Sequence, residues 1–174
     1  ACFSNNRVVG GGGGAGGTGD QSSLALTKVE WGRLVDIVDK DGFRVESDAL
    51  IRPDLVLGAD YALATNPVTE SETLAILQYA SGSKGMESLS NAAQSNLQVV
   101  TLKGPNSPSP YTQIPRNASV RLTFSSLLNE NSVNADTVQF WVGASSMTAQ
   151  DGRYLVENDE DAGIGIVIFD PTIS

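Results

Sequence analysis

The side chains that enzymes use most often for chemistry are scarce in this sequence. It contains no histidine, which removes the commonest general base and the commonest metal ligand. Its single cysteine, Cys2, excludes an intrachain disulfide and a zinc site built from cysteine and histidine. Acids are plentiful, but no motif places two of them for glycosidic bond cleavage. We therefore predict that the chain is not an enzyme.

One dense acidic stretch is the strongest candidate for a ligand site. Four carboxylates and the Asn158 amide occupy five consecutive positions. Such a density of like charge opposes folding unless the side chains are solvated or bind a cation. We favour a solvated turn and keep a calcium site as the alternative; no other cofactor is expected. The four possible calcium ligands are Glu157, Asp159, Glu160 and Asp161.

The N-terminus carries a lone cysteine followed by a low-complexity tract. Ala1 precedes Cys2, and residues 10–19 are almost entirely glycine. This arrangement resembles a bacterial lipoprotein just after its signal peptide, where a small residue precedes the cysteine that carries the lipid. The resemblance implies lipidation of Cys2, export, and a membrane as partner. Because glycine gains little from packing, residues 1–20 are expected to form a flexible tether. The alternative is an unmodified cysteine on a flexible tail.

The charge balance limits the remaining partners. The net charge is −9, and neither half of the chain carries a basic stripe. Phosphate neutralisation supplies most of the affinity for nucleic acid, so nucleic acid is not an expected partner. The sequence also has no apolar run of the 18 or more residues that a membrane helix needs. We expect membrane contact to come from the lipid on Cys2.

Residues 21–104 mostly alternate apolar and polar side chains, which is typical of strands. Residues 33–46 are predicted to form a β-hairpin, because Asp39-Lys40-Asp41-Gly42 is a strong turn signal between two apolar runs. The segment is therefore expected to be a β-rich domain, either a sandwich of its own or one that shares a core with the rest. Further strands are expected at 50–52, 55–57, 61–64, 73–78 and 97–102, and a short helix at 84–95.

Residues 105–174 follow a stretch at 103–110 that is rich in proline and serine and reads as a linker or loop. Val120, Leu122 and Phe124 alternate with polar residues, so one face of this strand is expected to meet a core. Later strands are expected at residues 137–142, 152–156 and 164–171, with an acidic turn at 157–163.

Three pieces of this segment resemble a bacterial immunoglobulin-like domain family found in large surface and secreted proteins. They are Ile114-Pro115-Arg116-Asn117, Val120 to Ser125, and Val133 to Val138. Leu127 stands where the family usually has proline, so the local turn can differ. The resemblance implies an immunoglobulin-like β-sandwich over 105–174, and no catalytic residues.

Together these features predict an all-β protein with one or more immunoglobulin-like sandwiches behind a flexible tether. We expect a non-catalytic structural or adhesive module, exported by a bacterium and anchored through Cys2. Its location is expected to be the cell surface, the outer membrane or the extracellular space. Other surface proteins or further copies of the chain are the expected partners. The alternatives are a calcium- or carbohydrate-binding accessory module of a larger surface protein, and a subunit of an extracellular filament.

Overall fold

The protein is described here from a computed structural model, which covers residues 24–68, 71–78, 83–100, 114–115, 117–142 and 148–171. Nearly half of these residues lie in β-strands and only a small share in helix, which confirms the all-β prediction. No helix in the described residues combines the length and hydrophobicity needed to cross a bilayer. The elements are β1 (Leu26–Val38), β2 (Arg44–Ile51), β3 (Tyr61–Thr65), β4 (Glu72–Ile76), α1 (Ser83–Gln94), β5 (Gln98–Val99), β6 (Ser119–Phe124), the 3-10 helix η1 (Glu130–Ser132), β7 (Trp141–Val142), β8 (Thr148–Ala149), β9 (Gly152–Asp159) and β10 (Ile164–Pro171).

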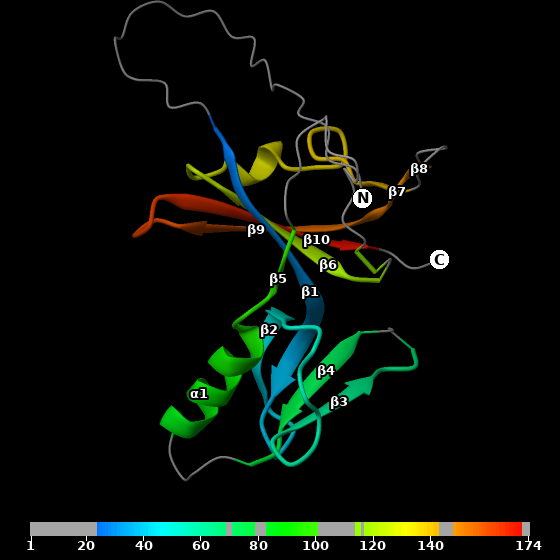
Figure 1. The fold of residues 1–174 in the computed structure, drawn as a ribbon, viewed down its shortest axis with the longest axis vertical. Coiled ribbons are helices and arrows are strands. Elements are labelled where there is room, and N and C mark those ends of the chain that lie inside the picture. Colours follow the sequence, from blue (N-terminus) through cyan, green and yellow to red (C-terminus); the bar gives the residue numbers. More distant parts are fainter. Residues whose placement is uncertain are drawn as a thin grey trace, which may run out of the picture.

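One long strand, β1, belongs to both halves of the molecule (Figure 1). Its first half, Leu26 to Gly32, pairs antiparallel with β6, which continues to β10 and β9. Its second half, from Arg33 to Val38, pairs antiparallel with β2 and parallel with β4, which continues to β3. We call the first group, with β5, the upper lobe, and the second group, with α1, the lower lobe. The two lobes therefore share one continuous backbone.

The lower lobe contains the predicted hairpin. Val38 pairs with Arg44, and Gly42 takes a φ of 84°, as the turn signal requires. The Asp39 side chain accepts hydrogen bonds from the backbone N–H groups of Asp41 and Phe43, which closes the turn. The hairpin prediction is thus confirmed, with β2 extending to Ile51.

Helix α1 lies against β2 and covers the lower-lobe core, and the predicted helix at 84–95 is confirmed within one residue at each end. The Tyr61 hydroxyl donates to the carbonyl of Leu89 at 2.8 Å. The Glu46 carboxylate accepts hydrogen bonds from Ser90 and Gln94. The buried side chains between helix and sheet are Val35, Ile37, Ala49, Ile51, Tyr61, Leu74, Ile76 and Ala93.

The predicted strand at 55–57 is wrong, because these residues lie in a loop between β2 and β3. Leu55 packs against the lower-lobe core from this loop, whereas Val56 and Leu57 are exposed. Residues 55–57 are all apolar, but they do not alternate between buried and exposed as the residues of a strand would. Only Leu55 contributes to the core.

The upper-lobe core draws on both predicted segments. Val29 and Val100 pack in one cluster with Val120 of β6 and Phe169 of β10. Phe140 stacks on Phe169 with ring centroids 4.1 Å apart. Val29 and Val100 therefore pack with residues of the last third of the chain, whereas the buried residues between Val35 and Ala93 form the separate lower-lobe core.

Gly32 lies where β1 passes from one lobe to the other. A Cβ atom at this position would lie 2.3 Å from the Ile51 carbonyl oxygen and 3.0 Å from a methyl group of Leu97. A backbone atom cannot move aside as the end of a flexible side chain can. Gly32 is therefore needed for the close approach of β2 and the Leu97 segment to β1.

We predict that Gly32→Ala destabilises the fold by about 1–3 kcal/mol, the usual cost of inserting an extra carbon into a packed site. Gly42→Asn is the matched control, because a side chain at Gly42 meets open space and asparagine tolerates a positive φ. Urea unfolding of both variants measures the difference. Equal stability of the two variants would contradict the close approach at Gly32.

Candidate functional site

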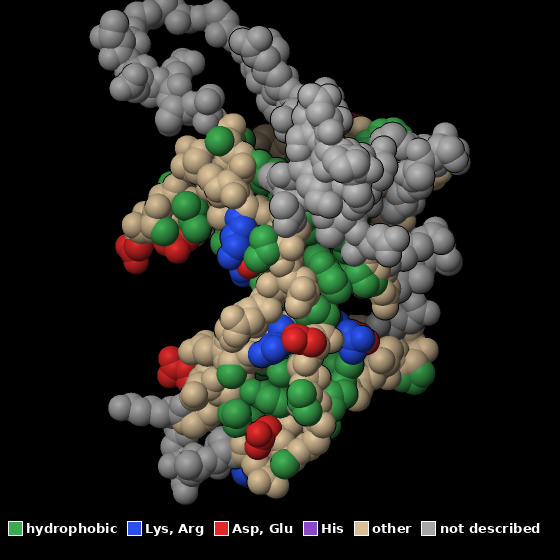
Figure 2. All heavy atoms as spheres, in the orientation of Figure 1, with side chains coloured by type: hydrophobic (Ala, Val, Ile, Leu, Met, Phe, Trp, Pro, Cys, Tyr) green, Lys and Arg blue, Asp and Glu red, His purple; other side chains and the backbone are tan. Residues whose placement is uncertain are grey.

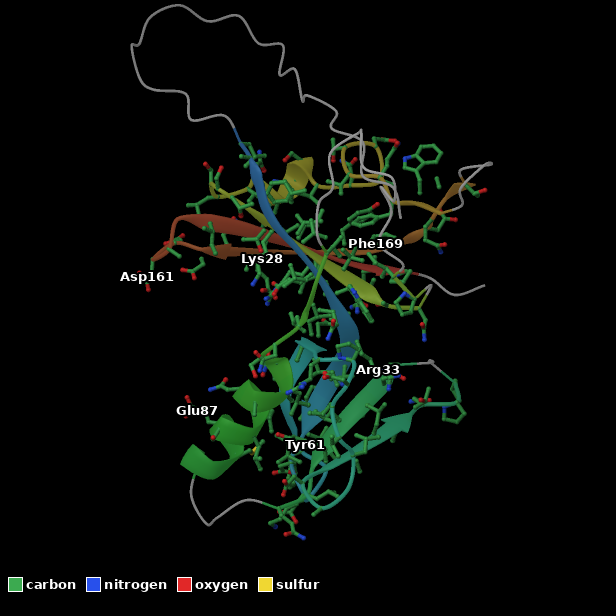
Figure 3. The ribbon with its side chains drawn as sticks, in the orientation of Figure 1. Lys28, Arg33, Tyr61, Glu87, Asp161 and Phe169 are labelled. Carbon is green, nitrogen blue, oxygen red and sulfur yellow. The ribbon has the colours of Figure 1, made fainter. Side chains whose placement is uncertain are left out.

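The predicted acidic cluster lies at the end of the β9–β10 hairpin. Glu157 and Asp159 belong to β9, opposite Ile166 and Ile164 of β10. Glu160 and Asp161 lie in the turn, and the side chain of Asp161 is seen at the hairpin tip in Figure 3. All four acids are exposed to solvent.

The acidic turn is shorter than predicted. Strand β9 continues through Asp159, so residues 157–159 are not part of the turn. Glu157 and Asp159 are exposed while Asn158 between them is partly buried. This alternation lets three polar residues remain in a strand, because each carboxylate reaches water and the amide finds protein partners.

Asn158 holds the loop before η1 against the hairpin. Its side-chain oxygen accepts from the Leu128 N–H at 2.8 Å, and its amide nitrogen donates to the Leu128 carbonyl at 3.0 Å. Gly165, opposite Asn158 in the ladder, leaves the space that the Leu128 side chain occupies. The Asn158 amide therefore has a structural role.

The described residues contain no group of three or more acidic, histidine or cysteine side chains placed to hold a metal ion. Asp159 instead accepts a hydrogen bond from the Ala162 N–H across the turn. The calcium site at Glu157, Asp159, Glu160 and Asp161 remains a prediction. Cys2, the glycine tract and the linker at 103–110 lie outside the described residues.

A second acidic residue, Glu30 of β1, was not identified from the sequence as a site residue. It is only 4% exposed, yet its carboxylate binds Lys28 Nζ at 2.7 Å and Arg121 Nη2 at 2.5 Å. Lys28 lies two residues away on the same face of β1, and Arg121 is the partner of Glu30 in β6. The signal in the sequence is the run from Lys28 to Trp31, Lys-Val-Glu-Trp, in which charged and apolar side chains alternate.

The surroundings of Glu30 lower the pKa of its carboxyl below the ordinary value of 4.5. Burial is the largest single effect and acts to raise the pKa, because it disfavours the charged form. Hydrogen bonds from Lys28 and Arg121, together with their positive charges, outweigh it. Glu30 is therefore held as a carboxylate that joins β1 to β6.

A third charged group bridges the two lobes. Arg153 of β9 binds Asp48 of β2 at 2.7 Å and lies 3.4 Å from Asp170 of β10. Asp170 also accepts from the Ser119 hydroxyl at 2.9 Å. Asp48 has a φ of 55°, in an irregular part of the β1–β2 ladder. Arg153 thus links a lower-lobe strand to two upper-lobe strands.

The lower lobe also exposes large apolar side chains, and hydrophobic atoms are visible on its surface beside a band of charged side chains in Figure 2. Phe43 is 72% exposed, Val56 83% and Val68 87%. They come from three different connections: the β1–β2 turn, the loop before β3 and the turn after β3. Scattered exposed apolar residues are normal in proteins, so they indicate an interaction surface only where a second feature accompanies them.

The comparisons with known proteins give no further guidance. A scan against protein-family models, a search of curated proteins and a search of solved structures each found no match to this chain.

We predict that Glu30→Gln lowers the stability at neutral pH by about 1.5–3 kcal/mol, the range for hydrogen bonds to charged groups. Because the folded-state pKa of Glu30 lies below its unfolded value, the contribution is fully present above the ordinary pKa of 4.5. It is lost as the pH falls through the lowered folded-state pKa. The difference between wild type and variant should therefore shrink in acid.

Urea unfolding of both proteins at neutral and at acidic pH measures this difference. Glu72→Gln is the control, because the Glu72–Arg33 pair is more exposed and such pairs contribute about 1 kcal/mol or less. A Glu30→Gln difference that stays constant between the two pH values would contradict a paired carboxylate at this position.

Proposed function

We propose that this chain is a non-catalytic structural or adhesive module, exported by a bacterium and held at the cell surface by a lipid on Cys2. The observation that carries the proposal is the order Ala1-Cys2, glycine tract, folded β-domain along the chain. A lipid on Cys2 would supply membrane affinity, and the glycine tract would separate the folded part from the headgroups.

The direction of β1 supports a display role. The strand begins at Leu26, at the top of the upper lobe in Figure 1, and ends beside the hairpin turn at the far end of the lower lobe. Thirteen residues of extended strand span about 40 Å. A tether that enters at Leu26 would therefore leave the lower lobe, with exposed Phe43 and Val68, facing away from the membrane.

The immunoglobulin-like part of the proposal concerns residues 105–174. Strand β6 covers most of the Val120–Ser125 motif, and its apolar side chains lie in the upper-lobe core. In the Val133–Val138 motif, the Thr137 hydroxyl donates to the Ser132 carbonyl at 2.6 Å, which closes a tight polar connection. Val133 and Val138 pack against the same core. These contacts are the observations that support the proposal of an immunoglobulin-like arrangement.

The anchor is tested by expressing the chain behind a signal peptide that ends at Ala1, in wild-type form and as Cys2→Ala. We expect the wild type in the membrane fraction, the variant in the soluble fraction, and an acyl or diacylglyceryl mass on the N-terminal peptide of the wild type only. Ser4→Ala is the matched control, because it changes a neighbouring polar residue and keeps the thiol. A soluble wild type with an unmodified Cys2 would overturn the anchor.

A further inference from the structure

The edge strands of the main sheet differ in how well they are protected against pairing with another chain. In the described part of the molecule these edges are β2, β3, β5 and β9. Proteins protect exposed edges with charges, proline, bulges or very short strands. Strand β5 has two residues, β2 carries three charged residues and an irregular register, and β9 carries Arg153, Glu157 and Asp159. Strand β3 reads Tyr-Ala-Leu-Ala-Thr and has none of these features.

The hydrogen bonds at the two ends of the β3–β4 ladder determine which backbone groups of β3 face outward. The Leu77 N–H donates to the Asp60 carbonyl, and the Asn66 N–H donates to the Ser71 carbonyl. Hydrogen-bonded and non-hydrogen-bonded pairs alternate along an antiparallel ladder. Residues 60, 62, 64 and 66 therefore bond to the β4 side, and residues 61, 63 and 65 direct their N–H and C=O groups to the outer edge.

One of these outward groups already has a partner. The Tyr61 carbonyl accepts from the Gly58 N–H at 3.0 Å, so the loop before β3 covers the start of the edge. Among the described residues no partner is seen for the backbone N–H and C=O groups of Leu63 and Thr65, which place two donors and two acceptors in a row on this edge. Two donors and two acceptors are enough for a short antiparallel pairing with another strand.

We propose that the outer edge of β3 pairs antiparallel with β3 of a second copy of this chain, about a two-fold axis at Ala64. Leu63 of each copy then lies opposite Thr65 of the other, and four N–H···O=C bonds form. Ala64 lies opposite its own counterpart, where methyl groups can approach closely. Tyr61 lies opposite Pro67, which has no N–H to satisfy, so the ladder ends where the loop covers the edge.

The charge distribution favours a second copy as the occupant. Residues 61–68 contain no charged side chain, although the chain as a whole has a net charge of −9. Two copies can therefore approach along this segment without placing like charges opposite each other, whereas β2 or β9 would bring charged side chains into the contact. The exposed Val68 lies in the turn that follows β3 and adds apolar surface beside the pairing. This inference does not depend on the lipid anchor.

The test uses the full chain in reducing buffer, so that Cys2 cannot form an intermolecular disulfide. Sedimentation velocity over a range of concentrations measures association, and amide hydrogen exchange follows Leu63 and Thr65. We expect both amides to exchange freely at low concentration and to gain protection as the dimer forms. Added salt should strengthen the dimer, because it screens the repulsion between two acidic chains.

Two variants and two controls make the result specific. Thr65→Pro removes an outward donor without removing a bond to β4, and should weaken the dimer about thirtyfold, since two of four bonds are lost. Ala64→Lys places two cations opposite each other and should also weaken it. Val45→Lys adds the same charge to β2 and should leave the dimer intact. Ala64→Pro removes a bond to β4 and should lower the melting temperature more than Thr65→Pro does.

Four outcomes would overturn the proposal. A chain that stays monomeric at millimolar concentration, with Leu63 and Thr65 exchanging freely, has no self-pairing edge. Protection of these amides at all concentrations would mean that the chain covers its own edge. A dimer that survives both Thr65→Pro and Ala64→Lys uses another surface. If the chain is monomeric alone and these amides become protected only with an added extended peptide, the edge binds a different protein and the proposal of a second copy is wrong.

Discussion

The backbone pairing of β1 is the constraint on which the rest of the structure depends. A strand that is hydrogen-bonded to β6 in its first half and to β2 and β4 in its second half cannot be moved in one lobe without disturbing the other. It also contributes Val29 to the upper core and Ile37 to the lower core. Gly32 allows this continuity, because the Ile51 carbonyl occupies the space of a side chain.

Some of the acidic residues of the chain form ion pairs on and beside β1. Glu30 and Asp36 of β1 and Asp48 of β2 each bind an arginine, and those arginines come from β6, β2 and β9. These carboxylates therefore stabilise the junction of strands and lobes, while the exposed acids of the β9–β10 hairpin lie away from it. The same distribution leaves β3 as an uncharged edge strand that is longer than the two-residue β5, which is the basis for its proposed pairing with a second copy.

Local features of the sequence predicted local structure well, and long-range pairing was the part that could not be predicted. The Asp39–Gly42 turn and the helix at 84–95 depend on neighbouring residues, so their patterns were sufficient. The pairing of β1 with β6 joins residues far apart in the sequence, and the alternation of apolar and polar residues does not reveal which strands pair. Similarly, Glu30 was missed because its partner Arg121 comes from a distant strand, and residues 55–57 looked like a strand although only Leu55 packs inward.

The central claim is that the two lobes form one cooperative unit because they share β1. Native-state hydrogen exchange at increasing urea concentration measures the opening free energy of amides in each half of the strand, such as those of Glu30 and Ile37. We expect the two values to converge on the same global unfolding free energy. A lower-lobe amide that opens at a clearly lower free energy, while the upper-lobe amide stays protected, would show that the lobes unfold separately and would contradict the account.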